Sequence, residues 1–195
     1  AANASTGVKE SLVKARGKES VISPNRTKLL QTIENEISKD DVQPGVKDQN
    51  GKPGTWCNRA AIRIASDNGI NTESLFNINP DTGKPDIEWT NANSIHDNAF
   101  KASKDKNSGV KSVTSEEAQK MANDGHVVIA TQEGSANSRG GRNSGHVGIV
   151  APDDKEYDSK KGPLVGQAGS QNGIRYADNS FVNSRTLLVL IFRYY

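Results

Sequence analysis

One cysteine stands where a loop rich in glycine and proline leads into an amphipathic segment at residues 57–68. With Thr55 as N-cap, Cys57 falls in the first turn of a helix, where free backbone N–H groups and the helix dipole favour a thiolate. Mostly small residues follow the cysteine along one stripe, so this helix can pack closely on a sheet. The alternative for a free cysteine is a small, buried and unreactive core residue. The segment alone supports a nucleophile and a core residue equally.

A cysteine nucleophile needs a base, and three histidines are available. We favour His146, because it shares a strand face with Gly148, where the missing side chain leaves room for the cysteine helix to approach. His126 begins its strand without such clearance, and His96 falls in a polar segment. A hydrogen-bonded structural histidine is the alternative for each of them.

The group that orients the base is predicted from strand register. A turn between two antiparallel strands would pair Val150 with Pro163. The same register places His146 opposite Gln167, with both side chains on one face, so the amide could hold the imidazole toward the thiol. A slip of one residue would turn Gln167 away. Asn172 is the rival, beyond the end of the His146 strand.

Other residues are candidates for supporting roles. The backbone N–H of Cys57 is the natural oxyanion donor, because it is free at a helix N-terminus. Further candidates for an oxyanion or secondary role are Gln49, Asn50, Trp56, Asn58 and Asn172. Candidates for substrate binding are Arg139, Arg142 and Trp89, although loop arginines are more commonly solvated. Isolated histidines without the spacing of a metal-binding helix lead us to expect no metal, and we expect no cofactor.

Composition limits the class of protein. The 195 residues suffice for one domain, and the 33% of hydrophobic residues indicates a modest core under long polar loops. The net charge of +2 is carried by scattered lysines and arginines, which argues against a nucleic-acid partner. No apolar run approaches membrane-spanning length. A start without methionine fits a chain after signal-peptide cleavage, although a recombinant start would look the same; we expect a secreted or periplasmic protein of the cell envelope.

The order of predicted elements indicates an α+β fold, with N-terminal helices packed on a small antiparallel sheet. Residues 1–22 are expected to form a flexible tail, and 23–195 a single domain with a polar insertion at about 71–111. This insertion is expected to hold one short helix and to serve as a lid or substrate wall. Helices are predicted at 23–38, 57–68 and 115–123, the last opened by a capping box at Thr114. Strands are predicted at 126–130, 145–150, 163–168 and 186–192.

Four segments resemble the CHAP and NlpC-type branch of the papain-like cysteine hydrolases. They are Thr-Trp-Cys-Asn at 55–58, Gly-His-Val-Val-Ile-Ala at 125–130, Ser-Gly-His-Val-Gly-Ile-Val at 144–150 and Gln-Ala-Gly-Ser at 167–170. The resemblance runs from about residue 25 to the C-terminus, and the segment 71–111 has no counterpart in it. It implies a papain-like fold and a secreted, phage-associated or toxin-associated enzyme that cuts amide bonds in peptidoglycan peptides. Cys57 would then be the nucleophile, His146 the base and Gln167 the third residue.

The hypothesis is therefore a cysteine-dependent amidase or endopeptidase that acts through an acyl-enzyme. Two alternatives stay open: a non-catalytic module on the same fold that binds the cell wall or a partner, and a papain-like acyltransferase or esterase. The expected partner is peptidoglycan or another peptide or amide substrate, with an inhibitor or immunity protein as a further candidate, and the chain is expected to be monomeric. The enzyme hypothesis predicts that iodoacetamide labels Cys57 below the ordinary thiol pKa.

Overall fold

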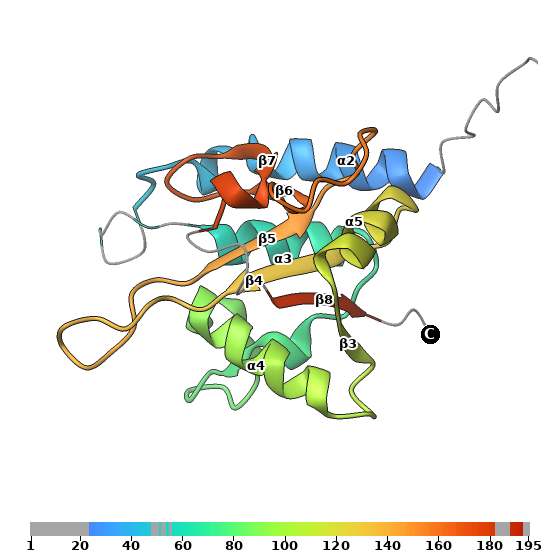
Figure 1. Cartoon of the computed structure of the whole chain (residues 1–195). Helices are drawn as coiled ribbons and strands as arrows, with labels where there is room; N and C mark the ends of the chain where they lie inside the picture. The colour runs from blue at the N-terminus through green and yellow to red at the C-terminus, as the bar shows by residue number, and fades with distance from the viewer. Residues whose placement is uncertain (1–23, 48–50, 52–53, 55, 182–187, 193–195) are drawn as a thin grey trace, which may run out of the picture.

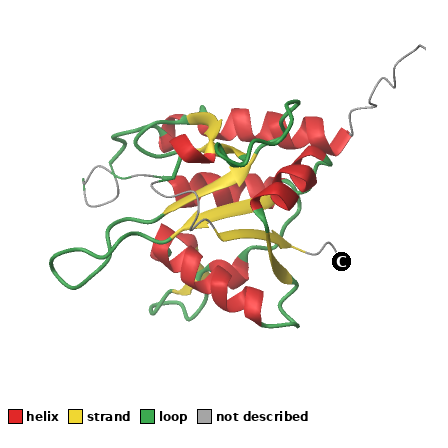
Figure 2. Cartoon of the chain, in the orientation of Figure 1, coloured by secondary structure: helices red, strands yellow, loops and turns green. Residues whose placement is uncertain are grey.

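The computed structural model describes residues 24–47, 51, 54, 56–181 and 188–192. Among these residues, four α-helices surround a six-stranded antiparallel sheet, and a small two-stranded sheet lies beside it (Figure 1, Figure 2). The chain is therefore mixed α+β, as predicted. The tail expected at 1–22 lies outside the described residues.

The bounds of the elements are as follows. The helices are α2 (Pro24–Ile37), α3 (Cys57–Asp67), α4 (Ala92–Lys104) and α5 (Ser115–Asn123), with short 3₁₀ turns η1 (Asp40–Val42), η2 (Glu73–Leu75), η3 (Ile87–Trp89) and η4 (Ala177–Asn179). The strands are β1 (Asn77–Ile78), β2 (Pro85–Asp86), β3 (Val110–Val113), β4 (Val128–Gln132), β5 (His146–Val150), β6 (Leu164–Gln167), β7 (Gly173–Tyr176) and β8 (Leu188–Phe192). The main sheet has the order β3-β8-β4-β5-β6-β7, so the last strand lies between β3 and β4.

The three helices predicted from the sequence are present, and three of their ends have the expected chemistry: the start of α5 and the C-termini of α3 and α5. Thr114 and Glu117 form the capping box at the start of α5. α3 and α5 each end at a glycine with positive φ, Gly69 at 82° and Gly125 at 90°. In both helices the N–H groups that follow bond back to carbonyls of the last turn, which closes the helix.

The strands predicted at 126–130, 145–150 and 163–168 are present as β4, β5 and β6, with shifted bounds. β4 begins two residues late, because the N–H of His126 bonds to the carbonyl of Met121 and closes α5. The sequence analysis missed β3 and β7, which are the two edges of the main sheet. Both are four-residue strands without a run of buried apolar side chains, so their pattern is weak.

The predicted register of β5 and β6 is wrong by two residues. Val150 pairs with Val165, whereas the sequence analysis predicted Pro163 as its partner. The turn between the strands is longer than assumed. Because side chains alternate along a strand, a shift of two keeps each of them on its face. Gln167 therefore still shares the face of His146, as a diagonal neighbour.

Helices cover both faces of the main sheet. On one face, α2, α3 and α4 share a core with Val147 and Ile149 of β5. On the other face, α5 packs against Val128 and Val150. Figure 1 shows α5 in front of the sheet and α3 behind it. The N-terminal helices pack on one face as predicted, and α5 adds a layer on the opposite face.

Gly148 has a different role from the predicted one. α3 packs on the face of Val147, whereas Gly148 belongs to the opposite face. A Cβ atom at Gly148 would lie 2.5 Å from Cγ1 of Val165. The glycine therefore leaves room for the Val165 side chain of β6, and it does not make room for the cysteine helix.

The segment 71–111 contributes to the core as well as to the surface. In place of one short helix, it contains the 13-residue helix α4, the β1–β2 pair and two 3₁₀ turns. Its side chains Leu75, Ile95 and Ala99 are completely buried in the core that includes α3. The start of α4 also lines a pocket beside Cys57, so part of the segment is a pocket wall.

A buried carboxylate joins α2 to the cysteine helix. Glu36 is 1% exposed and accepts from Lys39 and, at 3.1 Å, from Arg63 of α3. Arg63 also pairs with Asp41 of η1 at 2.7 Å. Because a buried carboxylate without a partner would cost several kcal/mol, these ion pairs favour one placement of α3 against α2.

Candidate active site

Cys57 is the first residue of α3 and is 3% exposed. The N-cap residue is Trp56, which makes no side-chain cap bond; the predicted N-cap, Thr55, lies outside the described residues. The backbone N–H groups of Val147, Asn58 and Cys57 itself act on the sulfur and lower its pKa. Three backbone donors therefore converge on the sulfur at the start of α3.

Burial opposes these donors and has the larger effect, so the pKa of the Cys57 thiol is raised above its ordinary value. The prediction that the helix N-terminus favours a thiolate is therefore wrong for the resting site. The sequence indicated the donors, whereas the depth of the sulfur depends on how β5 packs over the start of α3.

The imidazole of His146 is held on three sides. Its Nε2 lies 2.5 Å from Oε1 of Gln167. Its ring packs against Phe181, with 5.0 Å between ring centroids, and a Cβ atom at Gly169 would lie 3.5 Å from its Cε1. Burial lowers the pKa of His146, and the bond to Gln167 partly offsets this effect. The neutral imidazole is therefore favoured.

The orientation of the Gln167 amide defines the histidine tautomer. Gln167 is 7% exposed, and its Nε2 donates to the carbonyl of Gln171 at 3.4 Å. Its Oε1 is thereby turned toward His146, and an amide oxygen can only accept. The His146 Nε2 consequently carries the proton, and Nδ1 keeps its lone pair.

Cys57 and His146 lie on either side of one peptide unit. The N–H of Val147 lowers the pKa of the sulfur, and two covalent bonds separate that nitrogen from Cα of His146. The side chains belong to opposite faces of β5, since Cys57 packs with Val147 and the His146 ring packs with Phe181. No hydrogen bond joins the sulfur to the imidazole in the described part of the chain. The base and the thiol therefore flank the same peptide unit without a hydrogen bond between them.

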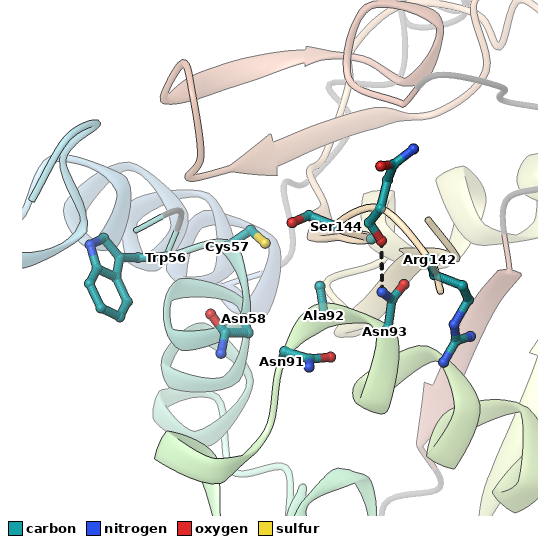
Figure 3. Close-up of a pocket in the computed structure, with 10 residues that line it drawn as sticks. Trp56, Cys57, Asn58, Asn91, Ala92, Asn93, Arg142 and Ser144 are labelled. Atoms are coloured by element: carbon teal, nitrogen blue, oxygen red, sulfur yellow. Dashed lines mark hydrogen bonds between the residues drawn. The ribbon is translucent and has the colours of Figure 1, made fainter. Parts of the chain in front are cut away.

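A pocket of about 290 Å³ opens beside the sulfur. Figure 3 shows the Cys57 sulfur and Ser144 facing each other across it. Polar amides form much of its wall; the lining includes Asn58, Asn91, Asn93 and Asn143. Among the described residues the lining has no carboxylate, and its one charged side chain, Arg142, is paired with Asp97 and Glu133, so this pocket suits a polar group such as a peptide amide.

A second cavity of about 860 Å³ lies on the His146 side. His146 and Gln167 line it together with His96, whose Nδ1 is 3.0 Å from Oγ1 of Thr131. Burial is the largest effect on His96 and lowers its pKa. The two cavities share the segment 143–145, which immediately precedes His146.

The secondary candidates have structural contacts. Trp56 lines the smaller pocket, and its ring nitrogen donates to the carbonyl of Val46 at 3.2 Å. Asn58 also lines the pocket and donates to the carbonyl of Thr90 at 2.7 Å, which leaves its Oδ1 available. Gln49 and Asn50 lie outside the described residues.

The side chain of Asn172 makes its hydrogen bonds to backbone groups. Its Nδ2 donates to the carbonyls of Ile37 and Val42 at 2.9 and 3.1 Å, and its Oδ1 accepts from the N–H of Gly169 at 3.0 Å. None of these hydrogen bonds is to His146. It instead holds Gly169, which lies against the imidazole, and ties this loop to the end of α2.

The predicted substrate-binding residues are separate from one another. Arg142 lies at the edge of the smaller pocket, with its guanidinium bound by Asp97 at 2.6 Å and Glu133 at 2.9 Å. Arg139 is exposed in the β4–β5 loop. Trp89 ends η3 and is 50% exposed. The pairing of Arg142 leaves Arg139 as the arginine available to a substrate carboxylate on this loop.

Sequence reasoning missed several residues of the site. Ser144, Phe181 and Asn93 show no periodicity and no charge pattern that marks them. Ser144 stood in the segment that resembles papain-like hydrolases, and its position directly before Gly145 and His146 was the available signal.

No protein-family model and no curated protein sequence matches this chain. None of the helices in the described ranges combines the length and hydrophobicity that a membrane-spanning helix needs. Among the same residues, no group of three or more His, Cys, Asp or Glu side chains could hold a metal ion.

Proposed function

We propose that this chain is a papain-like cysteine hydrolase that cleaves amide bonds in peptidoglycan peptides. Cys57 is the nucleophile, His146 the general base and Gln167 the residue that orients the base. The backbone N–H of Cys57 supplies the oxyanion donor, since it lies at the start of α3.

The observation that carries this proposal is the His146–Gln167 hydrogen bond beside the Cys57 sulfur. It holds the imidazole as the tautomer whose Nδ1 can accept a proton. The N–H of the next residue, Val147, lowers the pKa of the sulfur. We expect the thiol and Nδ1 of His146 to come into hydrogen-bond contact when substrate binds, as catalytic hydrogen bonds commonly tighten in the complex.

The pKa directions favour a particular order of proton transfer. Burial raises the pKa of Cys57 and lowers that of His146, so the proton stays on sulfur in the resting enzyme. As the sulfur forms its bond to the carbonyl carbon, Nδ1 of His146 takes the thiol proton. His146 then gives this proton to the amine as the C–N bond breaks, and water hydrolyses the thioester with the same imidazole as base.

The lining of the smaller pocket supports an amide substrate. Asn58 Oδ1 and Asn91 Nδ2 make no hydrogen bond among the described residues, so they offer one acceptor and one donor. A peptide unit has the matching N–H and C=O groups. Peptidoglycan as the source of that peptide, and the cell envelope as its place, follow from the resemblance of the sequence segments.

A non-catalytic binding module is the second candidate, and a specific observation favours it. The thiol of Cys57 is buried, its pKa is raised, and it makes no hydrogen bond to His146. A structural cysteine has these properties.

Purified peptidoglycan distinguishes these functions. We expect the wild-type chain to release peptides with a new amino group, detected by mass spectrometry, and Cys57→Ala to release none while its circular dichroism stays unchanged. Transfer of the acyl group to an added amine, with little hydrolysis, would indicate an acyltransferase. Equal binding of both proteins to peptidoglycan without any product from either would establish the binding module and contradict the proposed hydrolase.

A further inference from the structure

The segment Asn143–Ser144–Gly145 lies between the two halves of the proposed site. It lines both the pocket that holds Cys57 and the cavity that holds His146. It also leads directly into β5, whose first residue is His146. Any displacement of this segment therefore moves the base and the wall opposite the sulfur together.

Asn93, in the first turn of α4, fastens this segment in place. Its Nδ2 donates to the carbonyl of Asn143 at 2.8 Å, as Figure 3 shows. Its Oδ1 accepts from the N–H of Gly134 at 2.8 Å. One side chain thus bridges the two ends of the long β4–β5 loop.

Two glycines make this junction tight. A Cβ atom at Gly134 would lie 1.9 Å from the carbonyl oxygen of Asn143, and a Cβ at Gly145 would lie 2.5 Å from Oδ1 of Asn93. A side chain at Gly134 would push the two arms of the loop apart, and one at Gly145 would push its arm away from α4. The absence of side chains allows the Asn93 amide to contact backbone on both sides.

We propose that Asn93 is a positioning residue that sets the place of His146 relative to Cys57 by holding the segment 143–145 against α4. This inference rests on the proposed function. Asn93 touches neither reacting group, and it acts through the backbone that carries Ser144 and His146.

The test compares Asn93→Ala with Asn98→Ala. Asn98 lies on the same helix and donates to the carbonyl of Leu75 at 3.1 Å, away from the β4–β5 loop, so it is a matched control for loss of an asparagine. With a peptide substrate, Asn93→Ala should lower kcat by about tenfold to a hundredfold, because small displacements of a catalytic group have effects of this size. KM should change less than about twofold, and Asn98→Ala should retain the wild-type kcat.

Asn93→Asp sharpens the test. It keeps an acceptor for the Gly134 N–H but loses the donor to Asn143, so its kcat should fall between wild type and Asn93→Ala. The pH titration of the His146 ring protons, followed by NMR, should shift in Asn93→Ala and not in Asn98→Ala. Equal kcat losses and equal thermal shifts in the two alanine variants would show a structural role and overturn the proposal.

The NMR titration does not depend on turnover. If wild type proves inactive, the proposed hydrolase fails, and this measurement still decides whether Asn93 positions His146. An unchanged titration in Asn93→Ala would contradict the positioning role whether or not the chain is active.

Discussion

The position of a single proton governs the chemistry available to Cys57 and His146. Burial penalises the thiolate and the imidazolium alike, so it raises one pKa and lowers the other. Both effects keep the pair neutral at rest. A preformed thiolate–imidazolium pair, as a helix N-terminus and a carboxylate orienter would favour, is therefore not expected in this site.

This proton location predicts slow alkylation of Cys57, in place of the labelling below the ordinary thiol pKa that the sequence led us to expect. In the folded protein, iodoacetamide should react at least about tenfold more slowly at pH 8 than with the urea-denatured chain, because less thiolate is present and access is limited. The rate should rise with pH above the ordinary range of a cysteine thiol. Mass spectrometry of the labelled chain measures both rates. A fast, pH-independent rate at pH 6 would instead demonstrate an ion pair.

The orienting role of Gln167 predicts a charge effect on His146. In Gln167→Glu a carboxylate replaces the amide oxygen, so the pKa of His146 should rise and the acid limb of kcat/KM should move to higher pH. In wild type, that limb should lie below the ordinary histidine value of 6.5. Gln167→Met, which removes the bond at similar volume, should lower kcat by about a hundredfold.

A control for charge is available in the same cavity. Gln171 also lines it and its side-chain oxygen accepts from Arg175, so Gln171→Glu adds a carboxylate that already has a cationic partner. Its effect on the His146 titration, read by NMR, should be smaller. An equal shift in both glutamate variants would mean that His146 senses the cavity charge and not the specific bond.

At this scale, the sequence predicted that Gln167 meets His146 but not how the site residues are buried. Residue types and strand parity were enough to bring Gln167 to His146, because an error of two in register preserves the face. The pKa direction of Cys57 depends on the packing of β5 over α3, which no local pattern encodes. Asn172 has a side chain of the type that could orient the histidine, yet its amide donates to backbone carbonyls of α2 and η1.

Among the elements, the contact between α2 and the sheet has the least spare room. Gly166 of β6 lies under Ile33 of α2, and a Cβ atom there would lie 2.2 Å from Cγ2 of Ile33. Ile33 is completely buried, so it has no free space into which it can turn. Gln167, which orients His146, is the next residue along the strand.

We therefore expect Gly166→Ala to destabilise the fold by about 2 kcal/mol, the usual cost of overpacking a core. Gly141→Ala is the matched control, since its new Cβ would meet its nearest neighbour at an ordinary 3.5 Å, and it should leave stability within about 0.5 kcal/mol of wild type. Urea unfolding of the three proteins gives these values. Equal stabilities would show that α2 moves away from β6 at little cost.

Helix ends could be predicted where residues close in sequence make the hydrogen bonds that start or stop the helix. Thr114 with Glu117, and the glycines after α3 and α5, stop or start helices through bonds within a few residues. The edge strands β3 and β7 were missed, because their partners β8 and β6 supply the pairing, and β8 is distant in sequence from β3. Likewise, the polar composition of 71–111 hid the buried face of α4.

For the molecule as a whole, acid stability connects the site to the fold. His146 and His96 line one cavity, and burial lowers the pKa of each. In the unfolded chain both return to the ordinary value of 6.5 and take up protons at a higher pH than in the native state. The neutral histidines thus contribute stability that is complete above about pH 6.5 and is lost as pH falls toward their native pKa values.

The free energy of unfolding should consequently decrease between pH 7.5 and 5, by at most about 1.4 kcal/mol per pH unit for each proton taken up. His96→Gln should reduce this slope, because one of the two protons is no longer involved. Asp41→Asn is the control: Arg63 lowers the pKa of Asp41 below 3.8, so its own contribution disappears at more acid pH and the slope above pH 5 should stay that of wild type. Urea titrations at several pH values, followed by tryptophan fluorescence, measure the slopes. A free energy of unfolding that is flat from pH 7.5 to 5 would mean that both histidines are solvated when protonated. The assumption that His146 is buried and neutral, on which the proposed proton transfer depends, would then be wrong.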